Sequence, residues 1–296
     1  MKSWQYRYII WHNSKNNLYS YFKLFGQLPV SASEQFGDSN FKTVVYAKIV
    51  AAQIVNGLGF HMLFQDVDVI WNKDPVKEFK TQSKKYKDFD ILFMDDGKKY
   101  INLCLTSFIQ WFCIQTMFMT GIRNVLYAPY QANSGFYFAI SNERTQFFFR
   151  NLLFNGDNIM KWTSDQGVFN ALLPEYVSLL GMSVKTLHDL DFPGGFHYHR
   201  SKDFIKNIVE GKVEPVTFHM HWTKTALDKI NFMKQMGMWY IENKCMGNTK
   251  SIDLTISSCC SIKPLVDCFY FDKGSVPFCR NQQNMTSFDN NNYFWS

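Results

Sequence analysis

The spacing of apolar residues predicts that helices and short strands alternate along the chain. In residues 42–58 apolar side chains recur every three or four positions, the period of a helix with one buried face. Gly57 and Gly59 are placed to end that helix. The apolar run at residues 62–71 then predicts a strand, which the turn-forming residues before Pro75 end.

The same pattern continues along the chain as far as residue 222. We expect further strands at residues 6–11, 90–94, 136–140 and 216–222, helices at residues 144–154 and 165–173, and a loop at residues 29–38. Strands that alternate with helices are typical of an open, mostly parallel sheet with helices on both faces. We therefore predict an α/β fold that binds its ligand at the carboxyl ends of the strands.

Composition indicates a folded protein that does not bind nucleic acid. Of the 296 residues, 46% are hydrophobic and 19% are charged, which fits a chain with a buried core. The net charge is +6, but the densest lysine run, at residues 77–87, contains no nucleic-acid-binding motif. We interpret that run as a solvated surface. A mildly basic surface also suits an anionic substrate.

Cysteines set the end of the chain apart from the rest. Five of the seven lie in residues 245–296, without the C-x-x-C spacing or histidine partner of a zinc site. We expect one main domain at residues 1–244 and a poorly ordered or disulfide-linked tail at residues 245–296, in which at least one cysteine lacks a local partner. An N-glycosylation acceptor sequence at residues 284–286 also favours the secretory pathway.

We find no membrane anchor in the sequence. Residues 1–17 carry lysine and arginine among aromatic side chains and lack the pattern of a signal peptide. Residues 100–122 are long enough to span a bilayer, but several polar side chains interrupt them. We interpret them as a buried helix or as an insertion in the fold.

Two carboxylates interrupt the apolar run at residues 62–71. If that run is one strand, Asp66 and Asp68 point to one side, and Val67 and Val69 point to the other. Converging like charges are costly to bury without a cation, and their hard oxygen ligands suit Mg²⁺ or Mn²⁺. The alternative is a strand-end pair that caps neighbouring backbone amides.

A series of motifs makes the chain similar to one family. Lys48 on a predicted helix, a Gly-aromatic turn at residues 59–60, D-V-D-V-x-W at residues 66–71 and Pro75 resemble the nucleotide-diphospho-sugar transferases, which include plant arabinosyl-, xylosyl- and galactosyltransferases. Later motifs also resemble that family: N-x-G-F at residues 133–136, D-Q-x-x-F-N at residues 165–170, F-P-x-G at residues 192–195, a variant of H-x-N-W at residues 219–222, and a lysine and G-x-W up to residue 239. The matches cover residues 6–240.

The resemblance implies a Rossmann-like GT-A fold and a metal-dependent glycosyltransferase. Such an enzyme moves a hexose or pentose from a UDP-sugar to a hydroxyl of a glycan or glycoprotein. Asp66 and Asp68 are implied to bind Mn²⁺ or Mg²⁺ and the donor diphosphate, with His219 as a further metal ligand. His221 replaces the family's Asn, so either histidine, or both, can coordinate the metal. The alternative is that both are hydrogen-bonded core histidines.

Further matched positions imply contacts with the sugar nucleotide. Lys48 is implied to contribute to the donor site, and Lys229 or Lys224 to meet the diphosphate as a point charge. Asn133 and Gly135 are expected to shape the sugar pocket, where Gly135 allows close approach of the backbone.

Asp165 and Gln166 are the candidates nearest the reacting carbon. The resemblance implies a retaining reaction, in which they stabilise developing positive charge or hold the acceptor. Alternatively, or in addition, Asp165 caps the N-terminus of its helix.

The resemblance also implies a cellular location and leaves two rival functions. Family members are type II membrane proteins of the Golgi lumen; their anchor and an initial strand and helix do not occur here, so we expect a truncated or diverged member. One rival is a catalytically degenerate member that binds glycan or a partner protein. The other is a metal-dependent phosphohydrolase or nucleotidyltransferase, for which Asp95 and Asp96 would supply a second acidic cluster.

Overall fold

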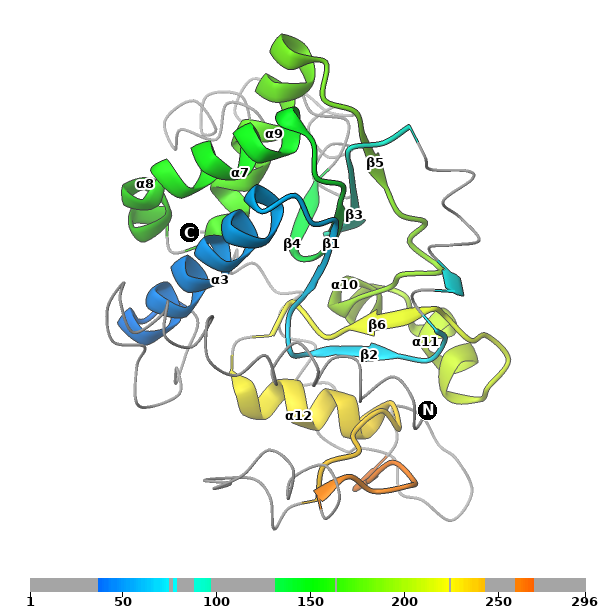
Figure 1. The fold of residues 1–296 in the computed structure, drawn as a ribbon. Coiled ribbons are helices and arrows are strands. Elements are labelled where there is room, and N and C mark those ends of the chain that lie inside the picture. The colour runs from blue at the N-terminus through cyan, green and yellow to red at the C-terminus, as the bar shows by residue number, and fades with distance from the viewer. Residues whose placement is uncertain are drawn as a thin grey trace, which may run out of the picture. The chain divides into compact units, whose positions relative to one another are not determined.

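The chain folds into two compact units that each contain helices and strands (Figure 1). This computed structural model describes residues 37–74, 77–78, 88–96, 131–162, 164–223, 225–242 and 259–268. The first unit takes in the described parts of Met1–Val67 and Lys73–Asp189, and the second those of Asp68–Asn72 and Leu190–Ser296. The α/β class predicted from the sequence is therefore confirmed.

The first unit contains a four-stranded sheet. Its strands are β1 (Met62–Gln65), β3 (Ile91–Asp95), β4 (Ala132–Ala139) and β5 (Val184–Thr186), in the order β1-β4-β3-β5. β4 runs antiparallel to both of its neighbours, whereas β3 and β5 are parallel. Three strands thus share one direction and β4 opposes them. The sheet is mixed, and among its described pairings only β3–β5 is parallel, so the prediction of a mostly parallel sheet is confirmed in part.

Four helices build the core of this unit on one face of the sheet (Figure 1). They are α3 (Ser39–Gly57), α7 (Glu143–Phe154), α8 (Gly156–Trp162) and α9 (Asp165–Leu180). The pairing register places Met62, Ala139 and Ile91 side by side, and all three belong to the same buried cluster as the helix residues. Within it, Phe148 and Phe169 meet edge to face with ring centroids 5.1 Å apart, which adds about 0.5–1.5 kcal/mol beyond burial.

Helices α3 and α7 begin at residues that supply caps for their free N–H groups. The Asp38 carboxylate accepts a hydrogen bond from the Phe41 N–H at 2.7 Å, and Asn142 and Thr145 form a capping box before α7. The predicted helices at residues 42–58, 144–154 and 165–173 are all present. α9 continues through Pro174 to Leu180. The predicted segments at residues 6–11 and 100–122, and nearly all of residues 29–38 and 77–87, lie outside the described residues.

A buried carboxylate holds the start of β3 in the first unit. Asp90 accepts hydrogen bonds from Asn142 Nδ2 at 2.6 Å, from two guanidinium nitrogens of Arg144 at 2.8 Å each, and from the Ser183 N–H at 2.8 Å. Burial by itself would raise the pKa of Asp90, but these donors, Arg144 first, outweigh it and lower the pKa. The network joins the beginnings of β3 and α7 to the residue just before β5.

The second unit is built on a two-stranded antiparallel sheet. β2 (Val69–Trp71) pairs with β6 (Thr217–His219), and the helices are α10 (Gly195–Arg200), α11 (Lys202–Val209) and α12 (Ala226–Gln235). Residues from β6 and all three helices form one buried cluster, which includes Tyr198, Ile205, Phe218 and Phe232.

The described part of the tail also packs in the second unit. The Glu242 N–H donates to the Cys259 carbonyl at 2.9 Å, and the Lys234 ammonium lies 2.7 Å from an Asp267 carboxylate oxygen. Cys260 is an exposed free thiol. Cys245 and Cys279 lie outside the described residues, and disulfide pairing in the tail stays a prediction. Among the helices in the described ranges, none is long and apolar enough to cross a membrane.

Two adjacent glycines allow the backbone of the second unit to pack closely beside β6. The His219 N–H donates to the Pro193 carbonyl at 3.1 Å. A Cβ atom on Gly194 would lie 2.0 Å from His221 Nε2, and one on Gly195 would lie 1.6 Å from the His221 carbonyl oxygen. Trp222, directly after His221, has a φ of +61°, a conformation that is uncommon outside glycine. The F-P-x-G sequence is therefore a packing requirement of the chain that carries His219 and His221.

We predict that Asp90→Ala destabilises the protein by about 2–4 kcal/mol, because it leaves buried donors and Arg144 without their acceptor. Urea unfolding at pH 7 measures the loss, and Asp88→Ala, an exposed carboxylate two residues earlier, is the control. Since the folded pKa of Asp90 is depressed, its contribution is present above the unfolded pKa of about 4 and fades as pH falls through the folded value. An equal effect of the two substitutions would contradict the assignment.

We predict that Gly195→Ala destabilises the protein by at least about 1–3 kcal/mol, because its methyl group would overlap the His221 carbonyl and force the backbone apart. Gly57→Ala is the matched control, since its Cβ would lie 3.4 Å from Gln53 Nε2, an ordinary contact. Thermal unfolding of both variants compares them. Unchanged stability of Gly195→Ala would refute the close packing.

Candidate functional site

Asp66 and Asp68 lie in a short connection between β1 and β2. The predicted single strand at residues 62–71 is wrong, because β1 ends at Gln65 and β2 begins at Val69. The Asp66 N–H donates to the Gly135 carbonyl at 2.7 Å, and the Asp68 carbonyl accepts from the Met220 N–H at 3.1 Å. The side chain of Val67 between them is 99% exposed, so it does not face the core as Val69 does.

Asp68 is a buried carboxylate with a cationic partner on one oxygen and an imidazole on the other. Its Oδ1 lies 3.3 Å from His219 Nε2, and its Oδ2 accepts from Lys229 Nζ at 2.5 Å. Burial by itself would raise the pKa of Asp68, but His219 and Lys229 outweigh it and hold the pKa well below its usual range. Asp68 therefore stays ionised, and its partners are side chains rather than the backbone amides of the capping alternative.

Asp66 and Asp165 share a lysine in the first unit. Lys48 Nζ lies 3.0 Å from Asp165 Oδ2 and 3.6 Å from Asp66 Oδ1. Burial alone would lower the pKa of Lys48, but the two carboxylates, Asp165 foremost, outweigh it and raise the pKa. Burial raises the pKa of Asp165, although Lys48 opposes this shift. The Lys48 ammonium thus compensates the negative charge of both Asp66 and Asp165.

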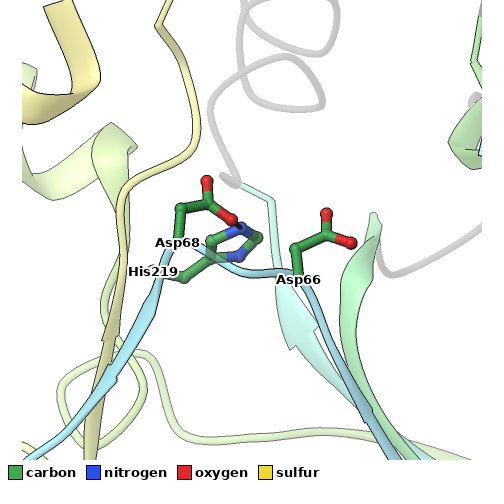
Figure 2. Close-up of side chains that lie close together, drawn as sticks. All are labelled: Asp66, Asp68 and His219. Atoms are coloured by element: carbon green, nitrogen blue, oxygen red, sulfur yellow. Dashed lines mark ion pairs between the residues drawn. The ribbon is translucent and has the colours of Figure 1, made fainter. Parts of the chain in front are cut away.

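Asp66, Asp68 and His219 form a group that is able to hold a metal ion (Figure 2). Each offers one ligand atom, and these atoms lie within 4.8 Å of one another. Two carboxylates and an imidazole are a ligand set that divalent cations accept. His219 Nε2, which lies 3.3 Å from Asp68 Oδ1, is the ring nitrogen beside that carboxylate.

His221 lies beside His219, with their ring centroids 4.9 Å apart. Burial, and next the positive character of His219, lower the pKa of His221 well below its usual value, so its ring is neutral. β6 ends at His219, so the two histidines are not neighbours on one face of a strand as the sequence pattern predicted. A role of His221 in metal binding stays a prediction, and Lys224 lies outside the described residues.

The beginning of α9 places Asp165 and Gln166. Ser164, not Asp165, caps this helix, because its hydroxyl accepts the Gln166 N–H at 3.1 Å. The capping alternative for Asp165 is therefore wrong, and its carboxylate points instead to Lys48. Asn170 connects α9 to β4 by two hydrogen bonds. Its side-chain amide accepts from the Ala132 N–H and donates to the Ala132 carbonyl. The D-Q-x-x-F-N sequence thus fixes the helix against the sheet.

Asn133 and Gly135 lie where β4 departs from regular pairing. The register with β3 shifts between Phe93 and Met94, which leaves Ser134, Gly135 and Phe136 outside that ladder. The Gly135 N–H donates to Asn133 Oδ1 at 2.8 Å, and the Ser134 N–H donates to Gln166 Oε1 at 3.2 Å. β-Bulges often occur next to functional sites because they redirect side chains.

One buried residue in this region has a role that we did not predict from the sequence. Asp96 accepts hydrogen bonds from Asn133 Nδ2 at 2.7 Å and from Gln166 Nε2 at 2.9 Å. In the sequence it stood out only as half of an acidic pair, Asp95-Asp96, after a strand. The position directly after a buried strand was the available signal, but nothing in it identified the two amide partners.

Comparison with known proteins identifies the family. The family model of the nucleotide-diphospho-sugar transferases matches residues 11–233, well over half of the chain. Searches of curated proteins and of solved structures find no match. The matched range contains Lys48, the Asp66–Asp68 pair, the D-Q-x-x-F-N sequence and His219, so the resemblance seen in the motifs is confirmed. The chain belongs to the nucleotide-diphospho-sugar transferase family.

Proposed function

We propose that this protein is an active glycosyltransferase that moves a hexose or pentose from a UDP-sugar to a hydroxyl group of a glycan or glycoprotein. The observation that carries the proposal is the Asp66–Asp68–His219 group in a chain of the sugar-nucleotide transferase family. The family supplies the type of reaction, and the group supplies a place for the cation that such a donor needs.

Asp66, Asp68 and His219 would hold Mn²⁺ or Mg²⁺. Carboxylate oxygens suit both ions, and an imidazole ligand favours Mn²⁺ over the harder Mg²⁺. When bound, the cation would supply positive charge that stabilises the departing diphosphate. The depressed pKa of Asp68 keeps this ligand ionised well below neutral pH.

Lys229 would bind a phosphate of the donor. Its ammonium lies on Asp68 and its side chain is 32% exposed, so the flexible stem permits the charge to reach a ligand in solvent contact. A cation on Asp68 would compete with Lys229 for the same carboxylate. Once displaced from Asp68, the Lys229 ammonium would have the donor diphosphate as its new anionic partner.

Asp165 would act at the reacting sugar. In the proposed reaction the bond from the anomeric carbon to the diphosphate oxygen breaks, and its electron pair leaves with UDP. The acceptor oxygen bonds to the same face of that carbon, and the hydroxyl proton passes to the departing diphosphate, so that configuration is retained. A buried carboxylate, 4% exposed in Asp165, stabilises the positive charge that develops on the sugar.

The contacts of Asp96 weigh against the rival phosphohydrolase function. That function would use Asp95 and Asp96 as a second acidic cluster. Both carboxylate oxygens of Asp96, however, already accept hydrogen bonds from buried amide groups. As for location, we propose the lumen of the Golgi, from the family and from the acceptor sequence at residues 284–286.

The first test is ligand-induced stabilisation. We expect UDP to raise the unfolding temperature only when Mn²⁺ is present, because the diphosphate would need the cation in order to bind. A ligand at a hundredfold excess over its Kd adds about 2.7 kcal/mol to the free energy of unfolding. For a chain of this size each kcal/mol corresponds to about 2–4 °C. Asp68→Asn should abolish the shift, since an amide is a poor ligand for these cations.

Asp203→Asn is the control for that test, because this carboxylate is exposed on α11 of the same unit. It should respond to UDP and Mn²⁺ as the unmodified protein does. If neither ligand shifts the unfolding of the folded, unmodified chain, the active-enzyme proposal fails and the degenerate transferase remains.

The second test concerns Asp165. We expect Asp165→Asn to lower kcat for Mn²⁺-dependent turnover of the donor about 100-fold or more, with little change in the Mn²⁺-dependent binding of UDP. Asp157→Asn, an exposed carboxylate on α8, should leave kcat unchanged. Loss of UDP binding with unchanged kcat would place Asp165 at the nucleotide instead of the sugar.

A further inference from the structure

The buried Asp96 lies at the centre of a hydrogen-bond network in the first unit. It directly follows β3, and only 2% of its surface is exposed. One carboxylate oxygen accepts from Asn133 Nδ2 and the other from Gln166 Nε2. A carboxylate only accepts hydrogen bonds, so Asp96 determines which end of each amide faces it.

This orientation decides what the opposite ends of the two amides do. With both nitrogens turned to Asp96, the oxygens Asn133 Oδ1 and Gln166 Oε1 are directed at the backbone of β4. There they accept the N–H groups of Gly135 and Ser134. These are two of the three residues that the register shift takes out of the ladder with β3, so the two side chains replace ladder bonds there.

The two residues held in this way contact Asp66 and Asp165, the two acidic residues of the candidate site in the first unit. The Gly135 carbonyl accepts from the Asp66 N–H at 2.7 Å. The Ser134 side chain forms a hydrogen bond with Asp165 that opposes the rise in the pKa of that carboxyl. A change in the orientation of either amide would therefore be transmitted to Asp66 and Asp165.

We propose that Asp96 is the positioning residue of the donor-sugar site. It acts through Asn133 and Gln166, which hold the irregular part of β4, and through Ser134 and Gly135, which hold Asp165 and Asp66. Asp96 contacts neither the reacting atoms nor the cation in this role. The inference about catalysis rests on the proposed function, whereas the inference about β4 does not.

Substitutions that exchange hydrogen-bond donors for acceptors test the network directly. In Asp96→Asn, one amide N–H of the new residue must face the N–H of Asn133 or Gln166. We expect hydrogen exchange of the Ser134 and Gly135 amides to become at least about tenfold faster. Gln166→Glu alone should have the same effect, because it sets two carboxylates against each other.

The double substitution D96N/Q166E should restore protection, because it exchanges donor and acceptor between positions 96 and 166 and keeps the acceptor for Asn133. The new amide at position 96 would donate to the new carboxylate at position 166 and accept from Asn133. That carboxylate would still accept from the Ser134 N–H. Asp88→Asn is the matched control and should leave exchange unchanged. Failure of the double substitution to restore protection, or slow exchange in both single variants, would overturn the network.

The catalytic half is tested with Mn²⁺-dependent hydrolysis of UDP-galactose, UDP-glucose and UDP-xylose. We expect Asp96→Asn to lower kcat about 10- to 100-fold, the usual effect of losing an outer-shell partner, and to weaken the Mn²⁺-dependent binding of UDP by a smaller factor, through Asp66. Unchanged kcat alongside faster exchange would overturn the positioning role. If the unmodified protein neither binds UDP nor turns over a donor, the proposed function fails, while hydrogen exchange still decides the role of Asp96 in β4.

Discussion

The need to pair buried carboxylate charge is the constraint on which the rest of this site depends. Asp68 and Asp165 are each less than a tenth exposed, and an isolated ionised carboxylate is very costly to bury. In the second unit His219 and Lys229 supply the compensation, and in the first unit Lys48 does. All three partners are far from these carboxylates in sequence, so the fold has to be formed before either charge is stabilised. Removal of one partner leaves the other group buried and unpaired, which costs more than the pair contributes.

Backbone packing determines where these charged groups lie. In the second unit the absence of side chains on Gly194 and Gly195 lets the segment after Pro193 run against His219 and His221. In the first unit the irregular part of β4 provides the carbonyl that holds the Asp66 N–H. Neither of these two backbone segments carries charge, yet each determines where a charged or metal-binding side chain lies. The glycines of the F-P-x-G motif are therefore explained in this chain by close approach of the backbone.

The sequence predicted which residues belong to the candidate site more accurately than it predicted their positions and contacts. The motif order selected Lys48, Asp66, Asp68, Asp165 and His219, because local residue patterns survive in a single sequence. It did not show which lysine pairs with which carboxylate, since that depends on tertiary contacts. The single strand predicted through Asp66 and Asp68 failed because an apolar run does not reveal where a strand leaves its ladder. β5 was not predicted because a strand of three residues is too short to show an alternating pattern. α9 was predicted too short because a proline such as Pro174 usually ends a helix.

The contacts of Asp68 lead to one further step about how the site handles charge. Asp68 Oδ2 accepts from Lys229, and the same carboxylate belongs to the group that is able to hold a cation. A divalent ion and an ammonium on one carboxylate repel each other, so in the proposed reaction the arriving ion would weaken the contact of Lys229 with Asp68. The donor diphosphate offers that lysine a new anion, so binding of the donor and of the cation would favour each other. By linkage, each ligand would strengthen the other by the same factor, which makes Lys229 the group that couples them.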